Sequence, residues 1–171
     1  MLSRVVLKKI KKKDEDRFLE LAKKNQQFHR HWVSVPKTSK AFRQYVKVMN
    51  TASEKSYLVW RKDNKDLAGV IELQDIYKAN FRNAYVIYYA FDGNQGEGLM
   101  AEAMREVISI AFKKLKLHRL EANIQPDNKA SRHLAKACGF RKEGLARQFL
   151  KKGGEWRDHE RWALLSTDVI G

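Results

Sequence analysis

The segment 85–115, YVIYYAFDGNQGEGLMAEAMREVISIAFKKL, decides the fold. Its first seven residues form strands readily and are apolar on both faces, which is typical of a central strand covered on both sides. From Leu99 to Leu115, apolar residues recur at the i, i+3, i+4 and i+7 positions, and this spacing predicts an amphipathic helix. Three glycines lie between the two patterns and permit a sharp turn. The segment therefore predicts a strand, a glycine-rich turn and a long helix.

The glycine-rich turn also has a chemical use. Backbone N–H groups at the start of a helix point outward, and the helix dipole favours an anion there. The spacing of Gly93, Gly96 and Gly98 is G-x-x-G-x-G. It lacks the Lys-Ser/Thr ending of a P-loop, and it is not the G-x-G-x-x-G of a dinucleotide fold. On its own, the turn is either a phosphate cradle or a structural connection.

The patterns on either side of this segment predict an α/β (α+β) fold. We expect helices over 14–24 and 42–49, strands over 57–60 and 67–73 with a turn at 63–66, a strand over 120–124, a helix from 126–128 to Gly139, and a hairpin over 140–165 that turns at 153–154. The order α-α-β-β-β-α-β-α-β-β predicts a mixed, twisted sheet with helices on both faces. Gly69, inside a strand pattern, indicates a bulge or a close approach.

Length and composition favour one cytoplasmic domain over 1–171. No Gly/Ser/Pro stretch divides the chain, and 43% hydrophobic residues exclude a disordered protein. The single cysteine, Cys138, excludes a disulfide framework and fits a reducing compartment. No His or Cys spacing suggests a metal site. The chain has no apolar run of 18 residues, and its first residues are too charged for a signal peptide, so we expect no membrane association.

The charge balance favours an anionic partner. The chain has 35 Lys and Arg against 20 Asp and Glu, a net charge of +15. Such an excess suits a nucleic acid, an anionic surface or a phosphate-rich cofactor. The basic run over 8–13 is either the end of a strand and a solvated turn, or a contact with RNA or another anionic surface.

Motifs across about two thirds of the chain resemble the Gcn5-related N-acetyltransferase (GNAT) superfamily, and in particular its RimJ/RimL-type branch of ribosomal-protein N-terminal acetyltransferases. The matching motifs are Gln95-Gly96-x-Gly98-Leu99-Met100-x-Glu102-Ala103, Leu117-His118-Arg119, Asn123, Pro126-x-Asn128-Lys129-x-Ser131, Gly139-Phe140-x-Lys142-Glu143-Gly144 and Gly153-x-x-Trp156-Arg157-Asp158-His159. One position departs from the pattern, because Gly93 stands where the family usually has Gln or Arg.

The resemblance implies the acyl-CoA N-acyltransferase fold, acetyl-CoA as co-substrate and no metal. In this family, the pantetheine arm of acetyl-CoA runs along the central strand where two halves of the sheet separate, so the same path is expected here. The cofactor-binding residues implied in this way are Tyr89, Ala90, Phe91, Gln95, Gly96, Glu97, Gly98, Leu99, Met100, Asn128 and Ser131. Lys129, Arg132 and Lys136 either contact the phosphates of the cofactor or form a solvated helix face.

The implied reaction is direct attack of a neutral amine on a thioester, which needs an acid for the leaving thiolate. Ser131 matches the serine of the branch and either protonates the thiolate or caps a helix, whereas Asn128 binds the cofactor, caps that helix, or does both. Glu72 is either the general base or part of a solvated strand face. Tyr88 and Tyr89 are alternative acids or core residues.

The resemblance also implies an acceptor, namely the α-amino group of a protein N-terminus, possibly that of a ribosomal protein. Deprotonating an α-amino group at pH 7.4 costs about 0.5 kcal/mol, against about 4 kcal/mol for a lysine. Two alternatives remain open: a small amine, antibiotic or amino acid as acceptor, and a non-catalytic RNA-associated module on the same fold. A deep acidic pocket would favour a small cation, and an open groove a polypeptide.

Three histidines are further candidates for the acceptor side of the site. His29 and His31 lie near the expected substrate side, either at the surface or in the site. His159 would organise the acceptor side or the terminal hairpin.

Proximity to ribosomal RNA through the basic surface is compatible with the charge. The protein is expected to be a monomer or a homodimer.

Overall fold

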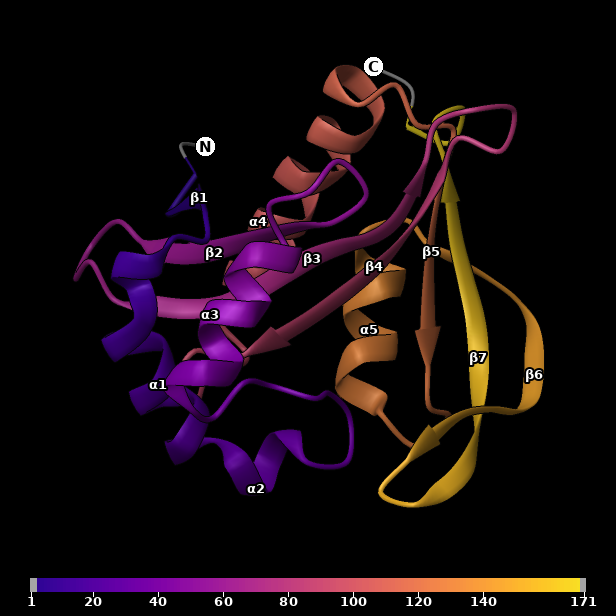
Figure 1. Cartoon of the computed structure of the whole chain (residues 1–171). Coiled ribbons are helices and arrows are strands. Elements are labelled where there is room, and N and C mark those ends of the chain that lie inside the picture. The colour runs from indigo at the N-terminus through magenta and orange to yellow at the C-terminus, as the bar shows by residue number, and fades with distance from the viewer. Residues whose placement is uncertain (1–2, 170–171) are drawn as a thin grey trace.

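The computed structural model describes residues 3–169, which form a seven-stranded sheet and its covering helices (Figure 1). The strands are β1 (Val5–Lys9), β2 (Lys55–Arg61), β3 (Leu67–Tyr77), β4 (Asn83–Ala90), β5 (Arg119–Ile124), β6 (Arg141–Lys152) and β7 (Glu155–Leu165). The helices are η1 (Lys12–Asp14), α1 (Glu15–Lys24), α2 (Gln26–His29), α3 (Ser39–Val48), α4 (Leu99–Ser109), its π-helical continuation η2 (Ile110–Lys114), and α5 (Lys129–Ala137). None of these helices within residues 3–169 is long and apolar enough to span a membrane.

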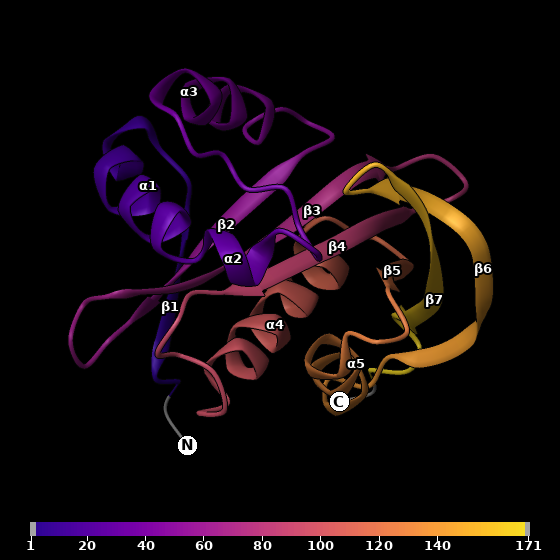
Figure 2. The same ribbon diagram turned by 90° about the horizontal axis from the view of Figure 1, so that it is seen from below.

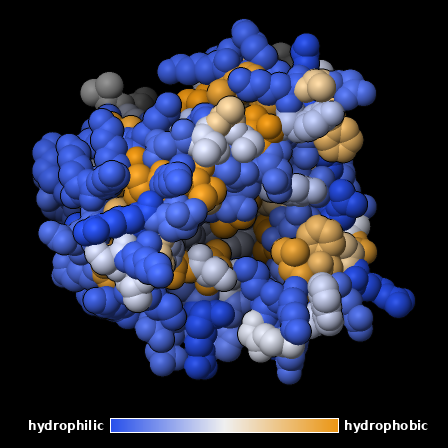
Figure 3. All heavy atoms as spheres, viewed as in Figure 1, coloured by the Kyte–Doolittle hydropathy of each residue, from blue (hydrophilic) through white to orange (hydrophobic). Residues whose placement is uncertain are grey.

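The sheet is mixed, as the sequence predicts. Its strand order is β1-β2-β3-β4-β5-β7-β6, so β4 is the central strand. Only β4 and β5 run parallel, and the other neighbours are antiparallel. Helices α1, α2 and α3 cover one face, whereas α4 and α5 cover the other (Figure 2). The visible surface is mostly hydrophilic, and hydrophobic residues show in scattered patches, some of which border a hollow near its middle (Figure 3).

The expected order of elements is wrong at the N-terminus. The described chain begins with strand β1, which lies at the edge of the sheet and pairs with β2, and not with a helix. The sequence indicates this strand only through one of the two interpretations of the basic run over 8–13, the end of a strand and a solvated turn. A strand of five residues that ends in Lys8 and Lys9 leaves little alternation to detect. The four-residue α2 was also missed, because a single turn is too short to show a helical period.

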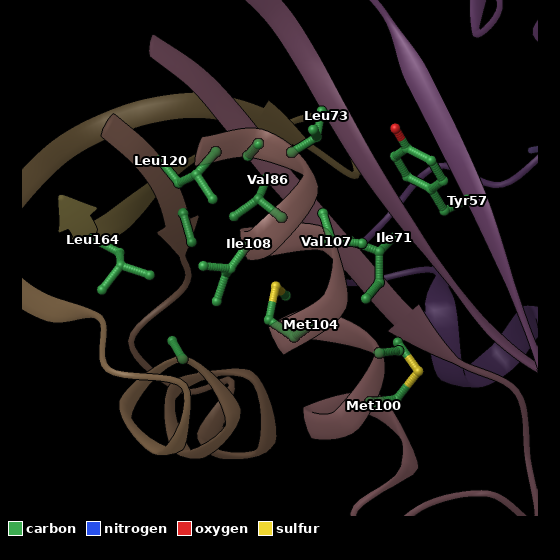
Figure 4. Close-up of a cluster of buried hydrophobic side chains, with 14 of the residues drawn as sticks. Tyr57, Ile71, Leu73, Val86, Met100, Met104, Val107, Ile108, Leu120 and Leu164 are labelled. Carbon is green, nitrogen blue, oxygen red and sulfur yellow. The ribbon is translucent and has the colours of Figure 1, made fainter. Parts of the chain in front are cut away.

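Two hydrophobic clusters flank the sheet. The larger one lies under α4, and Figure 4 shows Met104 and Ile108 of this helix among side chains of the sheet such as Ile71 and Val86. The smaller cluster joins α1 and α3 to the opposite face, with Phe18 at its centre. Burial on both faces explains the uniformly apolar sequence of the central strands.

Gly69 is a point of close approach, as its place in a strand pattern suggests. A Cβ atom at this position would lie 2.6 Å from Sδ of Met100 on α4 and 2.6 Å from the Tyr89 carbonyl oxygen on β4. The neighbouring strand β2, whose Val59 pairs with Gly69, has a register shift between Val59 and Trp60. The glycine therefore lets the beginning of α4 sit directly on the central strands.

Replacing Gly69 tests this packing. Gly69→Ala should lower the free energy of unfolding by about 1–3 kcal/mol, because the added methyl group meets backbone that cannot move aside cheaply. Gly144→Ala is the matched control, since a Cβ atom there meets nothing within 4 Å. Urea unfolding of both variants makes the comparison. Equal losses of stability would contradict the close approach.

Candidate active site

The candidate site begins where β4 and β5 separate. The two strands pair only at Asn83↔Arg119, Ala84↔Leu120 and Tyr85↔Glu121. Strand β4 continues to Ala90 along β3, but without a partner on its β5 side. The Phe91 N–H donates to Ala68 at the β3 side, so by strand alternation the backbone groups of Tyr88 and Ala90 face the gap. The gap thus presents a free strand edge.

A cavity of about 870 Å³ follows this gap. It is lined by β4, the turn before α4, the first turns of α5, the segment that begins in α2, and part of the β6–β7 hairpin. Among the residues expected from the sequence, those that line the cavity are Glu72, Tyr89, Ala90, Gln95, Gly96, Gly98, Met100, Asn128 and Ser131. The hollow in Figure 3 lies on this face of the molecule.

Three of the expected cofactor-binding residues have side chains outside the cavity lining. Phe91 is fully buried in the smaller core, and Leu99 is buried beneath the first turn of α4. The Glu97 carboxylate turns outward and pairs with Arg61 at 3.0 Å. These three side chains are therefore occupied by packing or by a surface ion pair. The main chain of Phe91 is occupied as well, because its N–H donates to Ala68 and its carbonyl oxygen accepts from Asn94. Phe91 thus offers no free polar group to a cofactor.

The glycine-rich turn has the backbone shape of an anion cradle. Gly93, Gly96 and Gly98 have φ angles of 84°, 78° and 79°, a region that glycine adopts without strain. A Cβ atom at Gly96 would meet nothing within 4 Å, so this side of the turn is open. Gly98 is the N-cap of the eleven-residue α4, whose dipole favours negative charge at this end.

Ser131 and Asn128 occupy the first turn of α5. The Asn128 Oδ1 atom accepts the Ser131 N–H at 3.1 Å, which confirms Asn128 as the helix cap. The Tyr88 hydroxyl on β4 donates to the Ser131 carbonyl oxygen at 2.8 Å. This bond crosses the gap and ties the two halves of the sheet. Because burial also raises the pKa of Tyr88 well above its ordinary value, Tyr88 is a poor proton donor.

Glu72 lies at the other end of the cavity, and it is not on a solvated strand face. Only 5% of the residue is exposed. The Tyr45 hydroxyl donates to one carboxylate oxygen at 2.5 Å, and the Gln74 amide donates to the other at 2.7 Å. Burial raises the pKa of Glu72 despite these hydrogen bonds. The carboxyl group is thus both fixed in position and more basic than usual.

Two histidines that line the cavity are buried, each with 3% of its surface exposed. His29 therefore does not lie at the surface, and its Nε2 atom donates to the Ala90 carbonyl oxygen at 2.8 Å. The Nδ1 atom of His159 donates to the Arg157 carbonyl oxygen at 3.0 Å, which leaves Nε2 as a free base. Burial lowers the pKa of both rings, which favours their neutral forms. Among residues 3–169, no cluster of His, Cys, Asp and Glu fits a metal ion.

The cavity is not acidic. Glu72 is the only carboxylate among its lining residues, and Lys129 and Lys152 lie there as well. The apolar side chains of Trp32 and Leu150 also line the cavity. Such a lining suits an uncharged or singly charged acceptor better than a polycation.

Residues 4–141 match the profile of the acetyltransferase (GNAT) domain. The chain belongs to the GNAT family of N-acetyltransferases. The free strand edge, the cradle before α4 and the cavity between them are the geometry that the resemblance in the sequence implies. The seven-stranded mixed sheet is likewise the fold expected from it.

The proteins that this chain resembles are named for different acceptors. The chain is 37% identical over 106 residues to the [ribosomal protein uS5]-alanine N-acetyltransferase of Escherichia coli, an alignment that covers 62% of this chain and 55% of that enzyme. The fold of this chain matches that of RimJ of Mycobacterium smegmatis in complex with CoA-disulfide, with a TM-score of 0.91 and 20% identity. The match covers 98% of this chain and 84% of that chain. The fold also matches that of spermidine N-acetyltransferase of Vibrio cholerae in complex with CoA and spermine (TM-score 0.84, 22% identity, 98% of each chain).

Sequence reasoning missed the free base at His159. The Trp-Arg-Asp-His motif drew attention to it only as an organiser of the acceptor side or the hairpin, because the bond that fixes its tautomer is to a carbonyl oxygen and leaves no trace in side-chain identity.

Removing the Tyr88 hydroxyl tests the bond across the gap. Tyr88→Phe should lower the free energy of unfolding by about 0.5–1.5 kcal/mol, the usual worth of one hydrogen bond. Tyr85→Phe is the control. It makes the same chemical change on the same strand, at a half-buried side chain whose hydroxyl has no hydrogen bond to residues 3–169. Urea unfolding should separate the two variants. A Tyr85→Phe loss as large as that of Tyr88→Phe would contradict the role of the bond.

Proposed function

We propose that this protein transfers the acetyl group of acetyl-CoA to the α-amino group of a protein N-terminus, in the manner of the ribosomal-protein acetyltransferases. The observation that carries this proposal is the continuous cavity, which joins an open glycine cradle at one end to the buried Glu72 at the other. Its single carboxylate disfavours a polyamine acceptor, although one structural neighbour acts on spermidine.

The residues around the gap fit acetyl-CoA. The pyrophosphate would bind the main-chain N–H groups of the turn from Gln95 to Met100, where the helix dipole adds to their effect. The pantetheine arm would hydrogen-bond to the free edge of β4 at Tyr88 and Ala90, as an added strand does. The cofactor supplies an acyl group activated as a thioester. Glu97 and Leu99 would contribute main-chain atoms alone.

Two side chains would manage the protons. Glu72 would accept the proton that the attacking amine releases, because its carboxylate is fixed and burial raises its pKa. Ser131 lines the cavity from α5, and its hydroxyl would return a proton to the departing thiolate. Since an α-amino group needs only about 0.5 kcal/mol to lose its proton at pH 7.4, a base of moderate strength is sufficient.

His159 is a second candidate for the proton acceptor. Its Nε2 atom is free, and the ring is held in one tautomer inside the cavity. Both oxygens of Glu72, in contrast, already accept hydrogen bonds. Either residue would act on the same reaction, so the choice between them concerns the mechanism and not the substrate.

The acceptor class is tested by acetyl transfer from labelled acetyl-CoA. Peptides with a free N-terminus and no lysine should become labelled, and the same peptides with a blocked N-terminus should not. Spermidine and aminoglycosides are compared at equal concentration. Label confined to spermidine would overturn the proposed acceptor and leave acetyl transfer intact, whereas coenzyme A that fails to bind at all would overturn the proposed reaction.

Replacing Gly96 tests the cradle. Gly96→Ala should weaken coenzyme A binding at least tenfold, because the methyl group occupies the open side of the turn. Gly154→Ala is the control for backbone strain, since Gly154 also has a positive φ angle (86°) and open space around it. Isothermal titration with coenzyme A makes the comparison. Unchanged affinity in Gly96→Ala would contradict the cradle.

The pH profile distinguishes the two proton acceptors. A carboxylate base works when ionised, so kcat/KM should fall as the pH drops through the raised pKa of Glu72. Glu72→Gln should lower the rate about 10²–10⁴-fold and abolish this acidic limb. His159→Gln should retain the limb with a smaller loss of rate. The reverse pattern would assign the base to His159.

Ser131→Ala tests the proposed acid. The turnover number should fall about 10²-fold or more, while the affinity for coenzyme A stays the same, because the hydroxyl acts only on the leaving group. The cap of α5 survives, since Asn128 bonds to the backbone of residue 131 and not to its side chain. An unchanged turnover number would remove Ser131 from the mechanism.

A further inference from the structure

A second groove lies between the start of α1 and α3. It shares no residue with the acetyl-transfer cavity. Its basic lining residues are Lys12, Lys13, Lys40, Arg43 and Lys47, and Glu15 is the only acidic one. The run over 8–13, for which the sequence allows either a solvated turn or an anion contact, thus supplies two residues of a groove that a distant helix completes.

The positive charge of this groove is largely uncompensated. Glu15 pairs with Arg43 at 3.2 Å and also accepts a hydrogen bond from Ser39. Lys12, Lys13, Lys40 and Lys47 take part in none of the ion pairs found within residues 3–169. Four ammonium groups around one groove repel one another, and a multiply charged anion would relieve that repulsion.

The basic surface continues beyond the groove. Asn50, which also lines the groove, donates to the Ile10 carbonyl oxygen at 3.2 Å, so the segment that contains Lys9 lies alongside. Lys9 and Lys78 are in turn close enough to Lys55 to contribute to the lowering of its pKa, whose main cause is burial. The positive charges therefore extend from α3 across the N-terminal segment to β2. A surface of this length suits a charged polymer better than a single phosphate.

We propose that this basic groove binds the phosphate backbone of RNA. The only apolar residue in its lining, Val46, is buried, so the groove exposes almost no apolar side chain that could insert into a bilayer or anchor an apolar protein partner. No aromatic residue lines the groove for the stacking of bases. Its contacts would be to phosphates, and they would be independent of sequence and sensitive to salt.

This site is separate from catalysis. Because the groove and the cavity have no residue in common, bound RNA would position the enzyme without entering the reaction. The proposal therefore stands or fails independently of the acceptor. A short peptide should be acetylated at the same rate whether or not the groove is intact.

The test compares two variants of equal charge. The groove variant carries Lys12→Gln, Lys13→Gln, Lys40→Gln and Lys47→Gln. The control variant carries Lys65→Gln, Lys113→Gln, Lys114→Gln and Lys116→Gln, which are exposed lysines away from the groove. Fluorescence anisotropy with a labelled RNA duplex of about 20 base pairs is recorded from about 50 to 200 mM salt, the range over which phosphate contacts weaken strongly. A polyglutamate peptide and phosphatidylserine vesicles are the competing probes.

We expect the groove variant to bind RNA at least tenfold more weakly at about 100 mM salt. The slope of log K against log salt should become shallower by about 0.9 for each phosphate that the variant no longer neutralises. The control variant should bind nearly as well as the unmodified protein, and both should acetylate a short peptide normally. Equal weakening in the two variants would show an effect of net charge alone and overturn the proposal. Tighter binding of polyglutamate or vesicles than of RNA would overturn it too.

Discussion

The separation of β4 from β5 after three residue pairs is the constraint on which the rest of the structure depends. A strand inside a sheet normally satisfies all of its backbone groups, and buried groups without partners are costly. Here the edge of β4 faces a cavity, and His29 covers one carbonyl oxygen, that of Ala90. The remainder of the edge stays free for a ligand that can bond to it as a strand would.

Each half of the molecule holds one side of this gap. On one side, α4 packs closely over Gly69 and fixes the glycine turn at the end of β4. On the other, Arg132 of α5 and Lys142 of β6 both pair with the buried Glu160 of β7, at 3.0 and 2.6 Å. The two halves meet again through the Tyr88 hydroxyl. Packing and ion pairs therefore support each side of the gap, and one hydrogen bond links the two sides.

The sequence was most informative where one local pattern was sufficient. The strand, turn and helix over 85–115, the Asn128 cap and the close approach at Gly69 all follow from periodicity or from glycine chemistry, and the structure confirms them. Other features depend on contacts between distant segments. Glu72 on β3 is fixed by Tyr45 on helix α3, and the basic groove forms where α3 meets the N-terminal run. No local pattern encodes such meetings.

A crystal structure of the protein with coenzyme A is the most direct test of the role assigned to the gap. We expect the pantetheine amides to bond to the main chain of β4 at Tyr88 or Ala90, the pyrophosphate to lie on the turn before α4, and the sulfur to lie beside the Ser131 hydroxyl. A cofactor bound elsewhere, or one whose pantetheine arm avoids the gap between β4 and β5, would contradict that role.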